Sequence, residues 1–294
     1  MSSSRDDSEV RTSDGRTLRV AQCGALDGSA VIYHHGWPSS RLLPGGHGEA
    51  AAERGIRLVS FDRAGYGGSS RAPGRTIGDV ASDTTAIADA LGIGSFGVWG
   101  VSGGGPHALA CAALLPDRVV AAAVVAGIAP FDLPGLDFTA GMGEASQVEF
   151  ALAPQGSAAY EPYVRDAAAA FLAGEAGHDG MESLLSPPDL ALMQSGRYDE
   201  HMEASKHEAL GGGIGGWLDD GLATVAPWGF DLASIHAPVL LLQGGRDLMV
   251  PPAHAHAMAA VLPRATLDYR SEEGHMTLGL APEPPLEWLA QHVR

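Results

Sequence analysis

The sequence predicts an α/β protein in which a mostly parallel sheet has helices on both faces. Short apolar runs alternate with helical stretches up to residue 126, and the alternation resumes near residue 238. Between these parts, from about residue 131 to residue 230, there are helical patterns but no clear core strand. The middle of the chain is therefore predicted to be a helical insertion, a cap over the carboxyl ends of the strands.

Runs rich in Val, Ile and Leu between turn residues identify the strands, and helical spacing of apolar residues identifies the helices. Gly92 marks the end of the first helix, and Pro106 stands near the first turn of the second. Because strand, helix and strand follow one another, the strands are expected to be parallel. The predicted strands are residues 17–22, 30–34, 56–61, 96–99, 119–126, 238–243 and 265–269. The predicted helices are residues 79–91, 106–115, 157–172, 188–195, 199–210, 253–262 and 285–293.

These elements predict a core that is interrupted by the cap. Residues 1–131 form the first part of the core, residues 132–230 the cap, and residues 231–294 the second part of the core. Residues 1–10 are polar and acidic and are expected to fray. The glycine-rich run of residues 211–216 is expected to be flexible or tightly turned.

Composition excludes several classes of protein. The formal net charge is −17, from 18 Lys and Arg against 35 Asp and Glu, so a nucleic-acid partner is not expected. No apolar run approaches the roughly 18 residues of a membrane helix, and the polar first ten residues do not read as a secretory signal. Cys23 and Cys111 do not imply a disulfide framework. A cytoplasmic location is predicted, and no metal or other cofactor is expected because no ligand set stands out.

The most informative motif is Gly100-Val101-Ser102-Gly103-Gly104, which lies between a predicted strand and a predicted helix. A Gly-x-Ser-x-Gly sequence in this context is a nucleophile elbow, in which glycines flank a turn too tight for side chains. The serine then points outward at a helix N-terminus, where free N–H groups favour a developing negative charge. Ser102 is the predicted nucleophile. The alternative is a glycine-rich loop with an incidental serine.

A second loop follows the strand at residues 30–34 and contains His35-Gly36-Trp37-Pro38. If this loop lies opposite Ser102, the Trp37 N–H and the Gly103 N–H are placed to form an oxyanion hole. The alternative is a simple turn between a strand and a helix. His35 is expected to support the loop by hydrogen bonding. Asp62, at the end of the next strand, is expected to be a structural carboxylate.

Two further residues complete a hydrolytic set. Asp247 follows an apolar strand at a glycine-rich turn, and His275 lies in a predicted loop just beyond the last strand. Serine needs a histidine to take its proton, and a carboxylate fixes the tautomer of that histidine. The order Ser102, Asp247, His275 is the order described for one class of hydrolases.

Together these motifs resemble those of the α/β-hydrolase superfamily. The resemblance implies an eight-stranded, mostly parallel sheet with a helical cap after the sixth strand. It also implies an alternative acid, because some members of the family carry the acid after the sixth strand, near Asp132 in this chain, and separate exchanges of Asp247 and Asp132 to asparagine distinguish the two. The stretch around Trp37 is similar to epoxide hydrolases and haloalkane dehalogenases, which carry an aspartate at the elbow where this chain has Ser102. That departure favours esterase-like chemistry. The motifs are His35-Gly36-Trp37-Pro38, Asp62-Arg63-Ala64-Gly65-Tyr66-Gly67, Gly100-Val101-Ser102-Gly103-Gly104, Gly245-Arg246-Asp247 and Gly274-His275.

The predicted function is hydrolysis of a carboxylic ester or lactone of small to medium size through an acyl-enzyme on Ser102. Alternatives with the same three residues are C–C bond hydrolysis and cofactor-free perhydrolysis, and a further alternative is a non-catalytic ligand-binding protein. The expected partner is a small-molecule substrate, with no nucleic acid and no membrane, and the chain is expected to be a monomer or a homodimer. The cap residues predicted to line the substrate pocket are Phe138, Met142, Tyr160 and Trp217.

Overall fold

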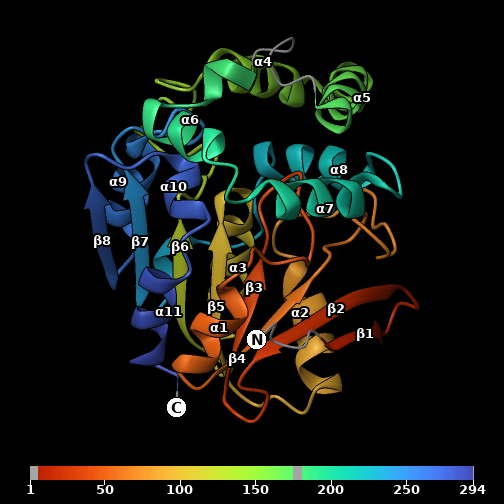
Figure 1. The fold of residues 1–294 in the computed structure, drawn as a ribbon, viewed down its shortest axis with the longest axis vertical. Helices are drawn as coiled ribbons and strands as arrows, with labels where there is room; N and C mark the ends of the chain where they lie inside the picture. The colour runs from red at the N-terminus through yellow and green to blue at the C-terminus, as the bar shows by residue number, and fades with distance from the viewer. Residues whose placement is uncertain (1–5, 175–180, 294) are drawn as a thin grey trace.

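A computed structural model describes residues 6–174 and 181–293, and an eight-stranded sheet runs through the middle of the molecule (Figure 1). The strand order is β1-β2-β4-β3-β5-β6-β7-β8. β2 is antiparallel to both of its neighbours, and the strands from β4 to β8 run parallel to one another. The mostly parallel eight-stranded α/β fold is therefore confirmed. The strands are β1 (Asp6–Arg11), β2 (Thr17–Gly24), β3 (Ser29–His34), β4 (Ile56–Phe61), β5 (Phe96–Val101), β6 (Val119–Val125), β7 (Val239–Gly244) and β8 (Ala265–Arg270).

The expectation that residues 1–10 fray is wrong for the described residues 6–10, which belong to strand β1. β1 pairs with β2 from Asp6 opposite Gln22 to Arg11 opposite Thr17. Val10 is its one buried residue, so the strand lacks the apolar alternation that identifies strands in a sequence. A polar strand is stable there because it lies at the sheet edge and is held by backbone hydrogen bonds. Residues 1–5 lie outside the described residues.

Alternate side chains of the central strands pack into two separate cores. Val98 faces a core formed with α2, α3 and α9, whereas Trp99 faces a core formed with α1, α10 and α11. This alternation follows from the two-residue period of a strand, and it explains why both faces of the sheet are apolar. The helices of the core are α1 (His47–Glu53), α2 (Val80–Ala90), α3 (Gly105–Leu114), α9 (Pro252–Val261), α10 (His275–Gly279) and α11 (Glu283–Ala290).

Among the described residues, five α-helices lie between β6 and β7 in the sequence and cover the carboxyl ends of the parallel strands (Figure 1). The helices predicted in this part of the chain are present, and the exact cap boundaries remain a prediction. Short 3₁₀ turns, η2 (Ala153–Gln155) and η3 (Met181–Leu184), join them. The helices are α4 (Glu144–Leu152), α5 (Ser157–Ala173), α6 (Pro187–Gln194), α7 (Asp199–Leu210) and α8 (Gly215–Val225).

Residues 211–214 form the expected turn, but the expectation is wrong for residues 215 and 216, because helix α8 begins at Gly215. A Cβ atom at Gly216 would lie 2.5 Å from the ring of Tyr66. Glycine at 216 is therefore needed for the close approach of α8 to the loop after β4. The sequence pattern cannot distinguish this packing role from flexibility.

A buried ion-pair cluster ties α8 to the loop after β4. The carboxylate of Asp220 in α8 forms ion pairs with Nη2 of Arg63, at 2.5 Å, and with Nη2 of Arg75, also at 2.5 Å. The Tyr66 hydroxyl donates to the same carboxylate at 3.0 Å. Burial alone would raise the pKa of Asp220, but the two guanidinium groups outweigh it and hold the pKa well below its usual value. This cluster joins the cap to the core electrostatically.

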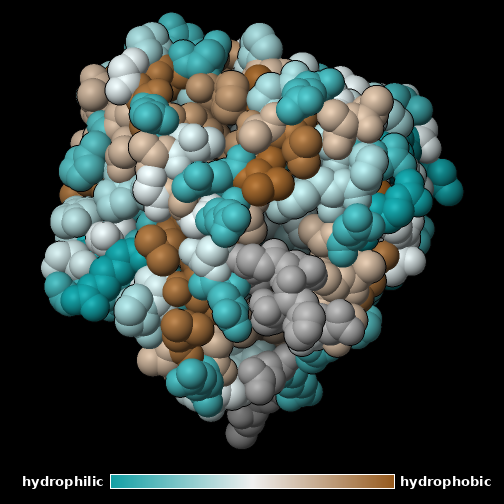
Figure 2. Space-filling model, turned by 90° about the horizontal axis from the view of Figure 1, so that it is seen from above, coloured by the Kyte–Doolittle hydropathy of each residue, from teal (hydrophilic) through white to brown (hydrophobic). Residues whose placement is uncertain are grey.

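On the cap side of the molecule, hydrophilic and hydrophobic residues are mixed, and the hydrophobic residues gather in several separate groups (Figure 2). Val148 of α4 and Leu190 of α6 are among the exposed large apolar residues. Within residues 6–174 and 181–293, no helix is both long and apolar enough to span a bilayer.

The Asp220 cluster generates a stability prediction. We expect Asp220→Asn to lower the free energy of unfolding by roughly 3–5 kcal/mol, because the buried guanidinium of Arg63 loses its counter-charge and that of Arg75 keeps only its ion pair with Asp219. Urea denaturation followed by circular dichroism measures this change. Glu161→Gln is the control, since the Glu161–Arg165 pair is exposed and its loss should cost less than about 1 kcal/mol. Equal losses in both variants would contradict this account.

Candidate active site

Ser102 stands at a sharp turn between β5 and α3, in the one-turn 3₁₀ segment η1 (Ser102–Gly104). Its φ is 54°, in the left-handed region that non-glycine residues seldom adopt. A Cβ atom at Gly100 would lie 2.4 Å from the Gly104 carbonyl oxygen, and one at Gly104 would lie 2.0 Å from the His34 carbonyl oxygen. Both glycines are sterically required, as the elbow motif predicts.

The loop that contains Trp37 lies directly against the elbow. A Cβ atom at Gly36 would be 3.2 Å from the Cβ of Ser102, and one at Gly103 would be 2.1 Å from Cε3 of Trp37. The backbones of the two loops can approach this closely only because positions 36 and 103 lack side chains. The two residues predicted to supply N–H groups, Trp37 and Gly103, are therefore in contact.

Two other residues support this arrangement, as expected from the sequence. The His35 ring is buried, and its Nε2 accepts the backbone N–H of Arg63 at 3.2 Å. Burial holds the pKa of His35 well below its usual value, so the ring is neutral near pH 7. Asp62 accepts the backbone N–H of Arg41 at 2.6 Å and the guanidinium of the same residue at 2.6 Å.

Asp247 and His275 form a buried hydrogen-bonded pair. Nδ1 of His275 lies 2.8 Å from Oδ2 of Asp247, and the two residues are 4% and 2% exposed. The other oxygen of Asp247 accepts the backbone N–H groups of Met249 at 2.9 Å and Val250 at 2.8 Å, which fixes the carboxylate. Asp132, the alternative acid, is exposed at the surface. In the structure, Asp247 is therefore the carboxylate that is hydrogen bonded to His275.

The electrostatics of His275 result from opposing effects. Burial by itself lowers the pKa of the imidazole, but the charge and the hydrogen bond of Asp247 raise it, and the charge of Asp189 adds to the increase. The net effect is a pKa above the ordinary value of 6.5. A histidine in this state is well suited to take a proton and to hold it as an imidazolium.

Asp189 is a candidate functional residue that the sequence did not reveal. It is buried at the start of helix α6 in the cap, and its carboxylate accepts the backbone N–H groups of His275 at 3.0 Å, Met276 at 2.8 Å and Thr277 at 3.1 Å. Ser186 donates to the same carboxylate at 2.7 Å. In the sequence, an Asp three residues after Ser186 looks like a cap for its own helix, so its distant partners are not visible.

This contact also corrects the local structure expected for His275. The residue was predicted to lie in a loop, but it is the first residue of the short helix α10. Helix α10 begins there because Asp189 satisfies the N–H groups of its first turn and complements its dipole. A side chain from the cap therefore fixes the backbone that carries the histidine.

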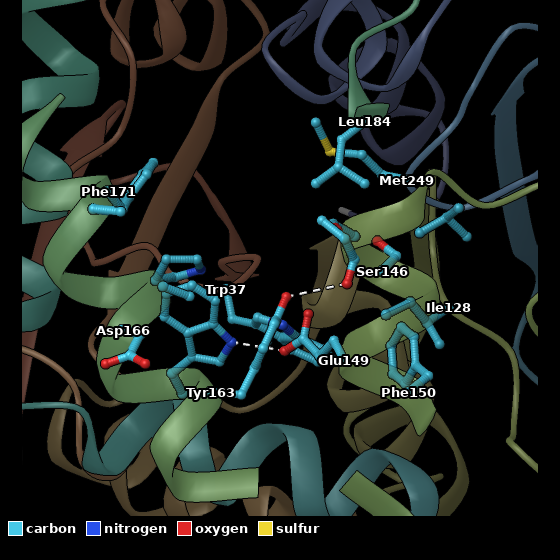
Figure 3. A pocket seen from close by; sticks show the side chains of 17 residues that line it. Trp37, Ile128, Ser146, Glu149, Phe150, Tyr163, Asp166, Phe171, Leu184 and Met249 are labelled. Carbon is cyan, nitrogen blue, oxygen red and sulfur yellow. Dashed lines mark hydrogen bonds between the residues drawn. The ribbon is translucent and has the colours of Figure 1, made fainter. Parts of the chain in front are cut away.

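Two adjoining cavities meet at Ser102. The larger chamber, of about 320 Å³, lies between α4 and α5, and the smaller chamber, of about 200 Å³, extends toward α7 and α10. Ser102 lines both chambers, whereas His275 lines the smaller one. Figure 3 shows the larger chamber, with Asp166 and Phe171 on one wall and Glu149 and Phe150 on the facing wall.

The predicted pocket residues are only partly matched by this lining. Trp217 lines the larger chamber, but Phe138, Met142 and Tyr160 are not among the described residues that line either chamber. Phe138 and Met142 are buried in an apolar cluster beside it. Tyr160 is buried behind Glu149, to which its hydroxyl donates. Aromatic content alone cannot tell a cavity wall from the layer behind it.

Glu149 is a second candidate that the sequence analysis missed. It is a buried carboxylate in a largely apolar chamber, and it accepts the indole N–H of Trp217 at 2.8 Å and the hydroxyl of Tyr160. Burial raises its pKa, while hydrogen bonds from Tyr160, Trp217 and Trp37 oppose that increase. On a helix surface, a lone Glu is normally solvated, so only the packing of α4 reveals its position.

Within the part of the chain that the structure describes, no group of three or more His, Cys, Asp or Glu side chains is placed to hold a metal ion.

Comparisons with known proteins agree with this fold. The sequence matches the family described as the alpha/beta hydrolase fold over residues 29–282. Among solved structures, a thermophilic esterase from Thermogutta terrifontis is similar with a TM-score of 0.72 and 23% identity, covering 98% of this chain and 100% of that one. Epoxide hydrolase A from Mycobacterium thermoresistibile is similar with a TM-score of 0.71 and 22% identity, covering 98% of each chain.

Two relatives share sequence with one part of the chain. A non-heme chloroperoxidase from Streptomyces lividans is 32% identical over 123 residues, and a bifunctional esterase/perhydrolase from Acinetobacter calcoaceticus is 30% identical over 123 residues. Each match covers 41% of this chain and 45% of the relative, so it spans less than half the length of these curated proteins. The family match, in contrast, extends over most of the sequence and agrees with the strand order and the elbow. The chain belongs to the α/β-hydrolase family.

Proposed function

We propose that the protein hydrolyses a carboxylic ester or lactone through an acyl-enzyme on Ser102. The observation that carries this proposal is the cavity that Ser102 shares with His275, whose ring is hydrogen bonded to buried Asp247. A serine and a histidine that line the same cavity, with a carboxylate on the far ring nitrogen, supply the groups that acyl transfer requires. The name of the Acinetobacter calcoaceticus esterase/perhydrolase supports the same reaction class.

The proposed reaction has two halves. In the first, Nε2 of His275 takes the proton of Ser102 as Oγ attacks the carbonyl carbon, and the ester C–O bond breaks as His275 returns that proton to the leaving oxygen. In the second, His275 takes a proton from water as the water oxygen attacks the acyl carbon. The bond between that carbon and Oγ of Ser102 then breaks as His275 gives the proton to Oγ, which releases the acid and restores the serine. Asp247 holds the imidazole in the required tautomer and stabilises its charged form.

The negative charge of each tetrahedral intermediate needs hydrogen-bond donors. We assign this role to the backbone N–H groups of Trp37 and Gly103, because their two loops are in contact beside Ser102. The N-terminus of α3 directly follows, and its dipole favours the same charge. Transfer of the acyl group to hydrogen peroxide in place of water would give a peracid, so perhydrolysis is the alternative reaction of the same site.

A covalent probe tests the nucleophile. We expect a fluorophosphonate to add one adduct to the wild-type protein and none to Ser102→Ala, because only an activated serine displaces fluoride from phosphorus. Intact mass measures the adduct. Ser39→Ala is the control and should still be labelled. If the folded wild type takes up no adduct, the non-catalytic ligand-binding reading is favoured instead.

The acid of the proposed triad is tested by exchange to asparagine. We expect Asp247→Asn to lower kcat/KM for a neutral ester by about 10⁴-fold, because the imidazole loses the group that fixes its tautomer. Asp132→Asn is the matched control and should change kcat/KM by less than about twofold, since Asp132 is exposed. A larger loss in the Asp132 variant would reverse the assignment.

A pH profile tests the contribution of Asp189. His275 acts as a base only when neutral, so kcat/KM should rise with pH through the raised pKa of His275. Asp189→Asn removes a charge that raises this pKa, and we expect the acid limb of the profile to move to lower pH. A merely structural role would lower activity at every pH without moving the limb, and that result would contradict the assignment.

A further inference from the structure

The two chambers that meet at Ser102 differ in which end of an ester they can hold. The leaving oxygen must come within hydrogen-bond reach of His275 to receive its proton. His275 lines the smaller chamber, together with residues of α7, and is absent from the described lining of the larger one. The leaving group therefore belongs in the smaller chamber. The larger chamber, between α4 and α5, is left for the acyl group.

The charged groups are also divided between the chambers by sign. The larger chamber is lined by Glu149 and Asp166 and, among its described lining residues, by no Lys, Arg or His. The smaller chamber is lined by Lys206, His201 and His275 and, among its described lining residues, by no Asp or Glu. Ser102 lies at the boundary between the two.

Lys206 supplies the positive charge of the smaller chamber. It is the single lysine in the sequence, and its side chain is only 6% exposed. Its ammonium lies 5.8 Å from the ring centre of Phe171, which lines both chambers. Its partner Glu203, at 2.6 Å, is 58% exposed, so solvent screens the carboxylate more than the ammonium. Burial lowers the pKa of His201 to about 4, which leaves that ring neutral near pH 7.

Glu149 supplies the opposite charge in the larger chamber. The three neutral donors around its carboxylate stabilise a negative charge there without cancelling it. Asp166, on the opposite wall of the chamber, is exposed and adds to the same potential (Figure 3). The aromatic walls around them, which include Trp37, Phe150 and Phe171, suit an apolar or cationic group. An anionic acyl group would be repelled.

We propose that the preferred substrates are esters with an uncharged or cationic acyl group and an anionic group, such as a carboxylate, on the leaving alcohol. This inference rests on the ester hydrolysis proposed above and adds the orientation of the substrate and the placement of its charge. Lys206 selects the leaving group, and Glu149 excludes carboxylates from the acyl side.

Three esters separate the two ends of the substrate. Ethyl butyrate is neutral, the butyric ester of glycolic acid carries a carboxylate on the leaving alcohol, and monoethyl succinate carries one on the acyl group. The kcat/KM of each anionic ester is measured at about pH 8, where carboxylates are ionised, and divided by that of ethyl butyrate. When the ratio of a variant is compared with the wild-type ratio, differences in the intrinsic reactivity of the three esters cancel.

The variants should give a crossed pattern. We expect Lys206→Met to lower the ratio for the glycolate ester about tenfold and to leave the succinate ratio unchanged. Glu149→Gln should raise the succinate ratio about tenfold and leave the glycolate ratio unchanged. Changes of this size are expected when one charge is removed a few ångströms from the carboxylate of the substrate, in partly screened surroundings. Glu203→Gln frees the charge of Lys206 and should raise the glycolate ratio about threefold. If Glu149→Gln fails to fold, Asp166→Asn tests the same chamber, with a smaller rise of about twofold.

Each outcome has a separate meaning. If wild type hydrolyses none of the three esters, ester hydrolysis itself is overturned. If ethyl butyrate is hydrolysed but neither ratio changes in any variant, ester hydrolysis stands and the charge selection is wrong. If Lys206→Met lowers the succinate ratio instead, the acyl group occupies the smaller chamber, and the orientation is reversed.

Discussion

The absence of side chains at four positions around Ser102 is the constraint on which the candidate site depends. Gly100 and Gly104 allow the chain to turn, while Gly36 and Gly103 allow the loop of Trp37 to lie against that turn. A Cβ atom at 103 would overlap the Trp37 ring. Ser102 is consequently held in a left-handed conformation at the carboxyl end of β5, where two chambers open on it.

The cap contributes to this candidate site, because cap side chains contact the core, and two of them are buried carboxylates. Asp220 of α8 is bound by Arg63 of the core, and Asp189 of α6 holds the first turn of the helix that His275 begins. Both carboxylates are fully buried, so neither contact can be lost without leaving polar groups unsatisfied. The position of the imidazole is therefore coupled to the position of the cap, and a movement of α6 would displace the backbone that carries His275.

The fold was largely predictable because it depends on local patterns. Apolar runs and helical spacing identified all the strands except β1, a polar edge strand whose pairing with β2 gives no apolar signal. The same reasoning failed at Gly216, where glycine serves close packing against Tyr66, and at His275, whose helix begins because of a carboxylate 86 residues away in the sequence. Local rules cannot report contacts between distant segments.

By itself, the sequence determined strands β2 to β8, most of the helices, the elbow motif at Ser102 and the candidates Asp247 and His275, because periodicity, glycine sterics and strand ends are local features of the chain. It did not reveal helices α1, α4, α8 and α10. Only the tertiary structure decided which side chains face the substrate space. Tyr160 lies behind the wall, while Glu149 and Lys206 line opposite chambers. The reason is physical: burial, charge and pKa depend on what surrounds a group, and those surroundings come from helices that meet only when the cap packs on the sheet.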